Sequence, residues 1–302
     1  MIWGSAFVAQ SLSVEHIGSF TFNATRSWVG ALVLLLLCVI VRKVKPQEVK
    51  TSEEKKAARR ELLKGGLVCG LFLTLGSNLQ QFGMHYGTNA GKAGFITALY
   101  IVLVPIFSIA FGKKANRRLL FCVVIAVFGL YFLSIVPGSD NGLQLGDVFV
   151  FLCAFAFSAQ ILSVDHFVQK VSGIELSCAQ FTVTAVISTV CALLFEEINV
   201  SELAVCAPYI LYVGIFSSGV AYTLQILAQK DGDPAVVSLL LSLESFFAVV
   251  SGAIILHEKL SSREYLGCAL MLAAVCLSQL PEKVQKSNEG TENSCFEQSD
   301  LS

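Results

Sequence analysis

Residues 156–166 read AFSAQILSVDH, and residues 6–16 read AFVAQSLSVEH. Eight of these eleven pairs are identical, and Glu15 is matched by Asp165, which carries the same charge. The two stretches lie 150 positions apart in a chain of 302 residues. Other segments pair at nearly the same offset, and a repeat of this kind predicts a duplicated structural unit.

The composition is that of a membrane protein. Hydrophobic residues make up 55% of the chain and charged residues only 14%, whereas about 25% of residues are charged in soluble domains. The charges also collect between long apolar tracts, so we expect an all-α polytopic protein in a lipid bilayer. A net charge of -1 gives no indication of a nucleic-acid partner.

The apolar tracts predict ten transmembrane helices, since a bilayer core takes about 20 helical residues. They are residues 2–14, 18–41, 65–85, 90–111, 117–136, 147–167, 175–195, 205–228, 234–256 and 262–280. The first tract spans only about 20 Å as a helix, and its counterpart begins near Gly146. The difference is explained most simply if the first helix begins upstream of Met1.

Basic residues predict the orientation of these helices. If ten helices alternate in direction, most Lys and Arg residues fall on one side, as in the 42–64 loop, whereas Lys92, Lys259 and Arg263 fall on the other. We therefore expect a cell-membrane protein with both termini and the 42–64 loop in the cytoplasm. The loop itself is either a topology signal or a lipid-binding site.

With five helices in each half, the second half enters the membrane from the opposite side. The predicted fold is therefore two inverted five-helix repeats, a common plan of secondary transporters. The first repeat is expected over residues 1–136 and the second over 147–281. Residues 282–302 are polar and are expected to form a disordered cytoplasmic tail.

Two tracts carry polar stripes with helical spacing. The stripes are Asn78, Gln81 and His85 in the third tract, and Tyr222, Gln225 and Gln229 in the eighth. Polar side chains in a membrane span usually pair, point inward or line a wet cavity. The stripes therefore indicate either a central cavity or hydrogen bonds that hold neighbouring helices together.

Glu244 lies about ten residues into the ninth tract, near the expected membrane midplane. Ser238, Ser242 and Ser245 form a stripe on the same helix, but Glu244 lies about 100° from Ser245 and about 200° from Ser242. The acid and the three serines therefore cannot all face one narrow cavity. Glu244 either ionises against a substrate or a proton, or is a structural acid that bonds a neighbouring helix.

Three other residues stand out within the apolar tracts: two basic residues and a proline. Arg26 lies early in the second tract, where its side chain either snorkels to the interface or binds substrate. Lys92 opens the fourth tract, either as an interfacial anchor or to attract an anion. Pro105 is expected to bend that tract near its middle.

No catalytic or metal-binding pattern is found. The ten cysteines lie mostly in apolar runs and lack metal-ligand spacing, so they are interpreted as packing residues. The chain has no HExxH motif and no phosphate-binding GxxxxGK[ST] motif, so neither an enzyme nor direct use of ATP is expected. No cofactor and no metal are expected.

Short motifs resemble a known family. Trp3-Gly4-Ser5-Ala6-Phe7 and the stretch Gly252 to Gly267, which contains His257-Glu258-Lys259-Leu260-Ser261, resemble EamA-type members of the drug/metabolite transporter superfamily. The family's usual Glu-Pro pair is Glu244-Ser245 here, and its Gly-Glu-Arg-Leu turn is replaced by residues 112–116. Over residues 2 to about 280, the resemblance implies two EamA repeats and a cavity lined by helices 1, 3, 4, 6, 8 and 9.

The candidate substrate-binding residues are polar or aromatic side chains on those six helices. They are Trp3, Gln10, Asn78, Gln81, Thr97, Tyr100, Gln160, Tyr222, Gln225, Ser242 and Glu244. The function expected is secondary transport of small metabolites, as an exporter or exchanger, by alternating access, with possible proton or sodium coupling. The alternative is a membrane scaffold or signalling protein that transports nothing.

Overall fold

The computed structural model describes residues 1–44, 51–88, 90–112, 117–134, 144–247, 262–278 and 280, and the regular secondary structure of these residues is helical. The helices are α1 (Ile2–Ser13), α2 (Ser19–Val44), α3 (Ser52–His85), α4 (Ala90–Thr97), α5 (Tyr100–Ala110), α6 (Arg117–Ser134), α7 (Leu145–Val168), α8 (Gly173–Phe195), α9 (Val200–Val205), α10 (Ala207–Tyr212), the π-helix η1 (Val213–Ala221), α11 (Tyr222–Asp231), α12 (Pro234–Leu241) and α14 (Ser262–Ser278). The expected tail at 282–302 and the stretch 257–261 lie outside the described residues.

Six helical segments in the described part of the chain are long and apolar enough to cross a membrane. They are Ser19–Val44, Ser52–His85, Lys92–Ala110, Leu145–Val168, Gly173–Phe195 and Ala207–Asp231. Pro234–Phe247 and Tyr265–Ser278 are apolar but shorter. The chain is therefore an all-helical, multi-pass membrane protein by length and composition, and the ten-helix inverted repeat stays a prediction.

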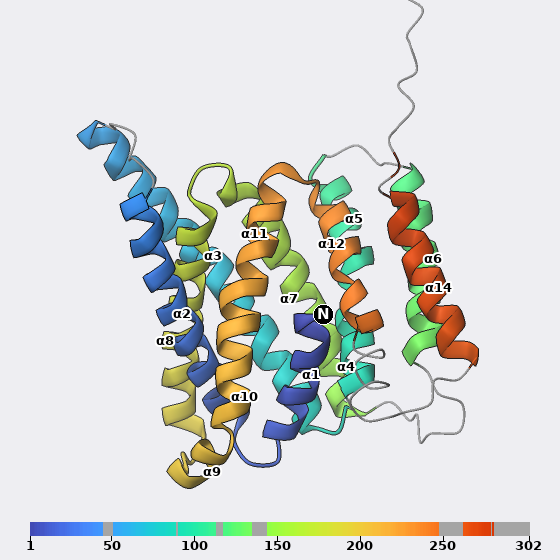
Figure 1. Cartoon of the computed structure of the whole chain (residues 1–302), viewed down its shortest axis with the longest axis horizontal. Coiled ribbons are helices and arrows are strands. Elements are labelled where there is room, and N and C mark those ends of the chain that lie inside the picture. Colours follow the sequence, from blue (N-terminus) through green and yellow to red (C-terminus); the bar gives the residue numbers. More distant parts are fainter. Residues whose placement is uncertain are drawn as a thin grey trace, which may run out of the picture.

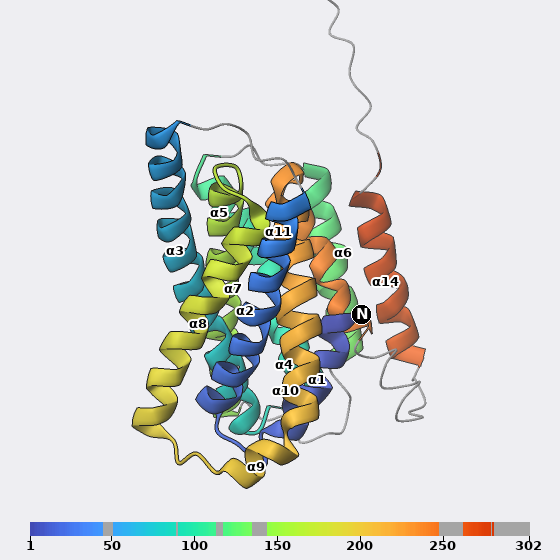
Figure 2. The same ribbon diagram turned by 60° about the vertical axis from the view of Figure 1, so that its left-hand side comes forward.

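The long helices form a bundle with a separate pair at one edge (Figures 1 and 2). Within the bundle α2 packs on α8, and α3 packs on both α7 and α8. At the edge α6 packs on α14, where a Cβ on Gly129 would lie 3.1 Å from the backbone oxygen of Gly267. Close contact between small residues is a usual way for membrane helices to associate.

The basic segment before the third tract is part of a continuous helix. Residues 52–64, which we expected within a loop over residues 42–64, belong to α3, which begins at Ser52 and runs to His85 without a break. Thr51 and Glu54 form a capping box at its start, in which each side chain accepts a hydrogen bond from the other residue's backbone N–H. This cap lets the helix begin well before the apolar residues do.

The side chain of Glu196, the residue that follows α8, caps the start of α2. The Glu196 carboxylate accepts hydrogen bonds from Phe20 N, Thr21 N and Thr21 Oγ1, each at 2.8 Å. These backbone N–H groups have no partner inside α2, and a negative charge is favourable beside them. The contact fixes the beginning of α2, and with it the position of Arg26 two turns further on.

Candidate functional site

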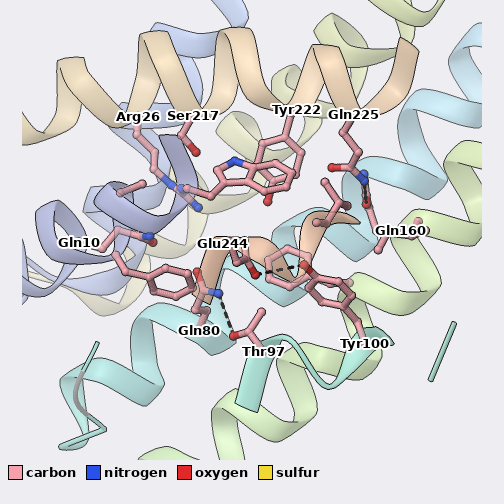
Figure 3. A pocket seen from close by; sticks show the side chains of 16 residues that line it. Gln10, Arg26, Gln80, Thr97, Tyr100, Gln160, Ser217, Tyr222, Gln225 and Glu244 are labelled. Carbon is pink, nitrogen blue, oxygen red and sulfur yellow. Dashed lines mark hydrogen bonds between the residues drawn. The ribbon is translucent and has the colours of Figure 1, made fainter. Parts of the chain in front are cut away.

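A small cavity lies between the central helices (Figure 3). Its polar lining consists of Gln10, Arg26, Gln80, Thr97, Tyr100, Gln160, Ser217, Tyr222, Gln225 and Glu244. Trp3, Phe7 and Phe157 add aromatic walls. The volume open to the centre of a water molecule is about 50 Å³, whereas one water needs about 10–15 Å³. The cavity therefore has room for a few waters or a small part of a ligand in this conformation.

Two helices are interrupted where they meet the cavity. The break between α4 and α5 falls at Ala98 and Leu99. Helix α12 ends at Leu241, and the chain turns at Ser242 before it becomes helical again. Pro105, where we expected a bend, lies inside α5, after the break at Ala98 and Leu99. Interrupted helices expose backbone groups and are a recurring feature of transporter binding sites.

Residues beside the two breaks contact each other. Tyr100 Oη donates a hydrogen bond of 3.2 Å to Glu244 Oε1, and the two positions are 144 apart in the chain. The same separation relates Gln81 to Gln225 in the two polar stripes. Only 6% of the Glu244 surface is exposed. The acid is thus buried, faces the cavity and is bonded to α5, as Figure 3 shows.

Arg26 brings a cation to the same cavity. Its side chain is 4% exposed, its Nε donates a 2.7 Å hydrogen bond to Asn23 Oδ1, and its guanidinium lies 5.7 Å from the centre of the Phe22 ring. Among the described residues no carboxylate lies within ion-pair distance of it. The snorkelling interpretation is therefore wrong, because packing of α2 directs the side chain into the bundle (Figure 3).

Asn23 joins Arg26 to two other helices. Its Nδ2 donates to Ser77 O and to Asn78 Oδ1, each at 3.1 Å, and Asn78 Nδ2 donates to Ser188 Oγ at 3.1 Å. These bonds link α2, α3 and α8 in a buried network. Such a network positions a side chain well only while all of its members are satisfied.

Replacing Asn23 with Leu is expected to destabilise the protein by about 2 kcal/mol, because three hydrogen bonds are lost and Arg26 Nε and Asn78 Oδ1 become unsatisfied. Equilibrium unfolding in detergent with a mild denaturant measures this loss. Asn23→Asp keeps an acceptor for Arg26 and is the matched control, expected to retain more stability than the Leu variant. Equal stability of the Leu variant and the parent would contradict the role of the network.

Three cavity-lining polar atoms have no hydrogen-bond partner among the described residues. They are the donor Trp3 Nε1 and the acceptors Gln10 Oε1 and Gln225 Oε1. A buried polar atom without a partner costs about 1–3 kcal/mol, so these atoms are expected to bond to water or to a ligand. The other amide atom of Gln225, Nε2, donates to Gln160 Oε1 at 3.5 Å and to Gln229 Oε1 at 3.2 Å.

Both halves of the chain match one family of membrane transporters. The model of the EamA-like transporter family matches residues 1–135 and, a second time, residues 144–280. The chain belongs to the EamA-like transporter family. This EamA-like chain is therefore a membrane protein of a family of transporters, which have small molecules as substrates.

Individual relatives are consistent with this membership. An "Uncharacterized transporter" of Archaeoglobus fulgidus is 29% identical over 289 residues, which cover 93% of this chain and 83% of the relative. The "Uncharacterized transporter YoaV" of Bacillus subtilis is 22% identical over 284 residues, with 92% and 93% covered. A crystal structure that is 17% identical superposes with a TM-score of 0.69 over 92% of this chain and 95% of its own. That structure supports the fold alone.

The structure of this EamA-like protein brings most of the sequence-predicted candidates together. Those that line the cavity are Trp3, Gln10, Thr97, Tyr100, Gln160, Tyr222, Gln225 and Glu244. Ser242 does not, because its hydroxyl donates to Leu239 O in its own helix at 2.7 Å. Asn78 and Gln81 do not line it either: Asn78 bonds to α2 and α8, and Gln81 Nε2 donates to Gln10 O at 3.4 Å.

Two polar lining residues, Gln80 and Ser217, are not among the sequence-predicted candidates. Gln80 lies one position before Gln81, about 100° around α3, and its Nε2 donates to Thr97 Oγ1 at 3.1 Å. Ser217 lies on the π-helix η1, a type of helix that occurs often at functional sites. Arg26 was recognised only as an alternative. An Arg within an apolar tract indicates a functional site, because a charged side chain is costly inside a membrane.

Lys92 does not reach the cavity. Its Nζ lies 2.6 Å from Asp147 Oδ2, and Asp147 Oδ1 accepts a 2.9 Å hydrogen bond from Thr88 Oγ1. Asp147 also accepts a bond from Gln144 N at the start of α7. The two interpretations of Lys92 were an interfacial anchor and an anion attractor. In the structure Lys92 forms an ion pair that ties α4 to the start of α7.

Proposed function

We propose that the protein is a secondary transporter whose cavity binds a small zwitterion with an apolar part and releases it by alternating access. The observation that carries the proposal is that one cavity is lined by a buried guanidinium, on Arg26, and a buried carboxyl group, on Glu244, neither of which forms an ion pair with a described residue. A buried charge is costly unless an opposite charge or donors compensate it. A zwitterion compensates both at once.

The rest of the lining fits the same class of ligand. Trp3 Nε1 can donate to an anionic group, whereas Gln10 Oε1 and Gln225 Oε1 can accept from an ammonium group. Tyr222 packs edge-on against Trp3, with ring centres 4.8 Å apart, and supplies an apolar wall. Polar groups at fixed points on an otherwise apolar surface are typical of small-molecule sites.

The architecture proposed is ten helices in two inverted five-helix repeats, over residues 1–136 and 147–281, with both termini in the cytoplasm. It is supported by the two matches to one family model, at 1–135 and 144–280. The helix breaks at Ala98–Leu99 and at Ser242 lie at nearly the repeat offset. Rocking of one repeat against the other would then open the cavity to each side in turn.

Whether the cavity can be reached from both sides of the membrane distinguishes a transporter from a scaffold, and this test needs no known substrate. Ser217→Cys, in a variant with the ten native cysteines replaced, is expected to react with a membrane-impermeant thiol reagent added to either face of a reconstituted vesicle. Ser158, which is buried and donates to Ala154 O at 2.7 Å, supplies the control as Ser158→Cys, expected to stay unreactive. Reaction from one face alone would contradict alternating access and favour a static scaffold.

We propose that Glu244 couples transport to protons, since a buried carboxylate can hold a proton or the ammonium group of a ligand, but not both. An imposed pH gradient is then expected to accelerate zwitterion transport by the parent in vesicles, and a sodium gradient is not. Glu244→Gln is expected to lose the response to the pH gradient. An unchanged response in this variant, or a response to sodium alone, would rule out proton coupling through Glu244.

A further inference from the structure

A second concave site lies at one end of the bundle, away from the cavity. It is bordered by the end of α2, the start of α3, the turn from α7 to α8 and the end of α11, all at the upper end of Figure 1. Its volume open to the centre of a water molecule is about 760 Å³. We call it the basic groove after its charged lining residues, Arg42, Lys55, Arg59, Lys170, Lys230 and the single acid Glu175.

Much of the positive charge in the groove is not neutralised by the protein. Arg42 Nη2 lies 2.7 Å from Glu175 Oε1, and Lys170 Nζ lies 3.5 Å from Glu61 Oε2. Lys55, Arg59 and Lys230 have no ion pair with any described residue. Five cations and one acid thus converge on one groove. The cations repel each other, and a bound anion would offset this repulsion.

The general bias of basic residues toward one side does not explain this convergence. That bias requires Lys and Arg on the loops at one end of the bundle, at any angle around it. Here the cations come from four separate elements and face the same space. Lys55 and Arg59 do so because they are four residues apart on α3, on the face that also places Ala58 and Leu62 against the groove.

Apolar side chains continue from the groove along α3. Leu63 and Leu67 are exposed, and Val44 at the end of α2 is exposed as well. A soluble anion would use the cations alone. A glycerophospholipid carries its phosphate directly beside its acyl chains, so it would place the phosphate among the cations and the chains along this apolar surface.

We propose that the basic groove binds the phosphate headgroup of an anionic phospholipid in the adjacent leaflet. Lys55, Arg59 and Lys230 supply the charge for the phosphate, and Arg42, oriented by Glu175, completes the groove. Bound there, the lipid bridges α2, α3, α8 and α11. Because α3 and α11 also line the cavity, through Gln80 and Gln225, the lipid holds together elements of the transport site.

The test compares two pairs of basic residues on the same helix. Lys55 and Arg59 line the groove, whereas Lys56 and Arg60 are exposed and do not line it. The variants Lys55→Gln/Arg59→Gln and Lys56→Gln/Arg60→Gln remove the same charge. All three proteins are purified in a neutral detergent, depleted of lipid, and titrated with phosphatidylglycerol or with phosphatidylcholine of the same chain length.

Phosphatidylglycerol is expected to raise the unfolding temperature of the parent and of the Lys56/Arg60 variant by about 3 °C, and that of the Lys55/Arg59 variant by less than half as much. Phosphatidylcholine is expected to produce no shift. Equal shifts in both variants would overturn the groove as the site. A shift of the same size with soluble glycerol phosphate at equal concentration would assign the groove to a free phosphate compound and overturn the lipid.

Discussion

Exchanging Arg26 for Gln is expected to weaken binding of a zwitterion at least about 30-fold and leave a cavity that prefers a cationic ligand. Arg26 is the only described basic residue that lines the cavity, so its loss leaves Glu244 as the sole side-chain charge there. Removing one partner of a buried charge contact typically costs at least about 2 kcal/mol, or about 30-fold in affinity. Glu244→Gln is expected to do the reverse and leave a cavity that prefers an anion.

The measurement uses matched ligands that differ in one charge. L-alanine, L-leucine and L-phenylalanine are tested first by calorimetric titration of the purified parent. For L-leucine, isocaproate lacks the ammonium group and isopentylamine lacks the carboxylate. The parent is expected to bind the zwitterion best, Arg26→Gln to bind isopentylamine best, and Glu244→Gln to bind isocaproate best.

This exchange of preferences separates a binding role from a structural one. A variant that merely loosened the fold would bind all three ligands less well and would keep their order. Failure of the parent to bind any zwitterion would overturn the substrate class. It would leave the transporter proposal standing if Ser217→Cys still reacted from both faces of the membrane.

The second large effect is expected at Gly146, where Gly146→Ala should strongly reduce both the recovery of folded protein and its unfolding temperature. A Cβ at this position would collide with Gly83 O and lie 2.9 Å from Tyr86 O. Both are backbone atoms of α3 and its C-terminal turn, so neither can move aside as a flexible side chain would. Overpacking of a tight contact costs about 1–3 kcal/mol, and here the cost is expected at the upper end.

Gly94 provides the matched control for this substitution. It is also a helical glycine, but a Cβ there would have its nearest neighbours at 3.8 Å, from Phe7 Cε2 and Ser245 Oγ. Gly94→Ala is therefore expected to keep or slightly raise stability, since Ala favours a helix over Gly by about 1 kcal/mol. The yield of monodisperse protein and its unfolding temperature are compared. Similar values for both variants would contradict the tight contact between α3 and α7.

The sequence by itself determined the class of the protein and the approximate position of its helices. A helix needs about 20 apolar residues to cross a bilayer, and whether a stretch has them can be read from that stretch alone. The apolar tract at 18–41 became α2, and that at 175–195 became α8, each within a few residues. The family could be recognised for the same reason, since its motifs are local as well.

Only the tertiary structure decided which face of each helix meets the cavity. Gln80 and Gln81 are adjacent in the sequence but point about 100° apart, and the contact of Gly83 with Gly146 and the bonds of Asn78 to α2 and α8 set the rotation of α3. The direction of Arg26 likewise depends on Asn23 and on the packing around α2. The angle of a helix about its own axis is fixed by its neighbours, and the sequence of that helix alone does not contain it.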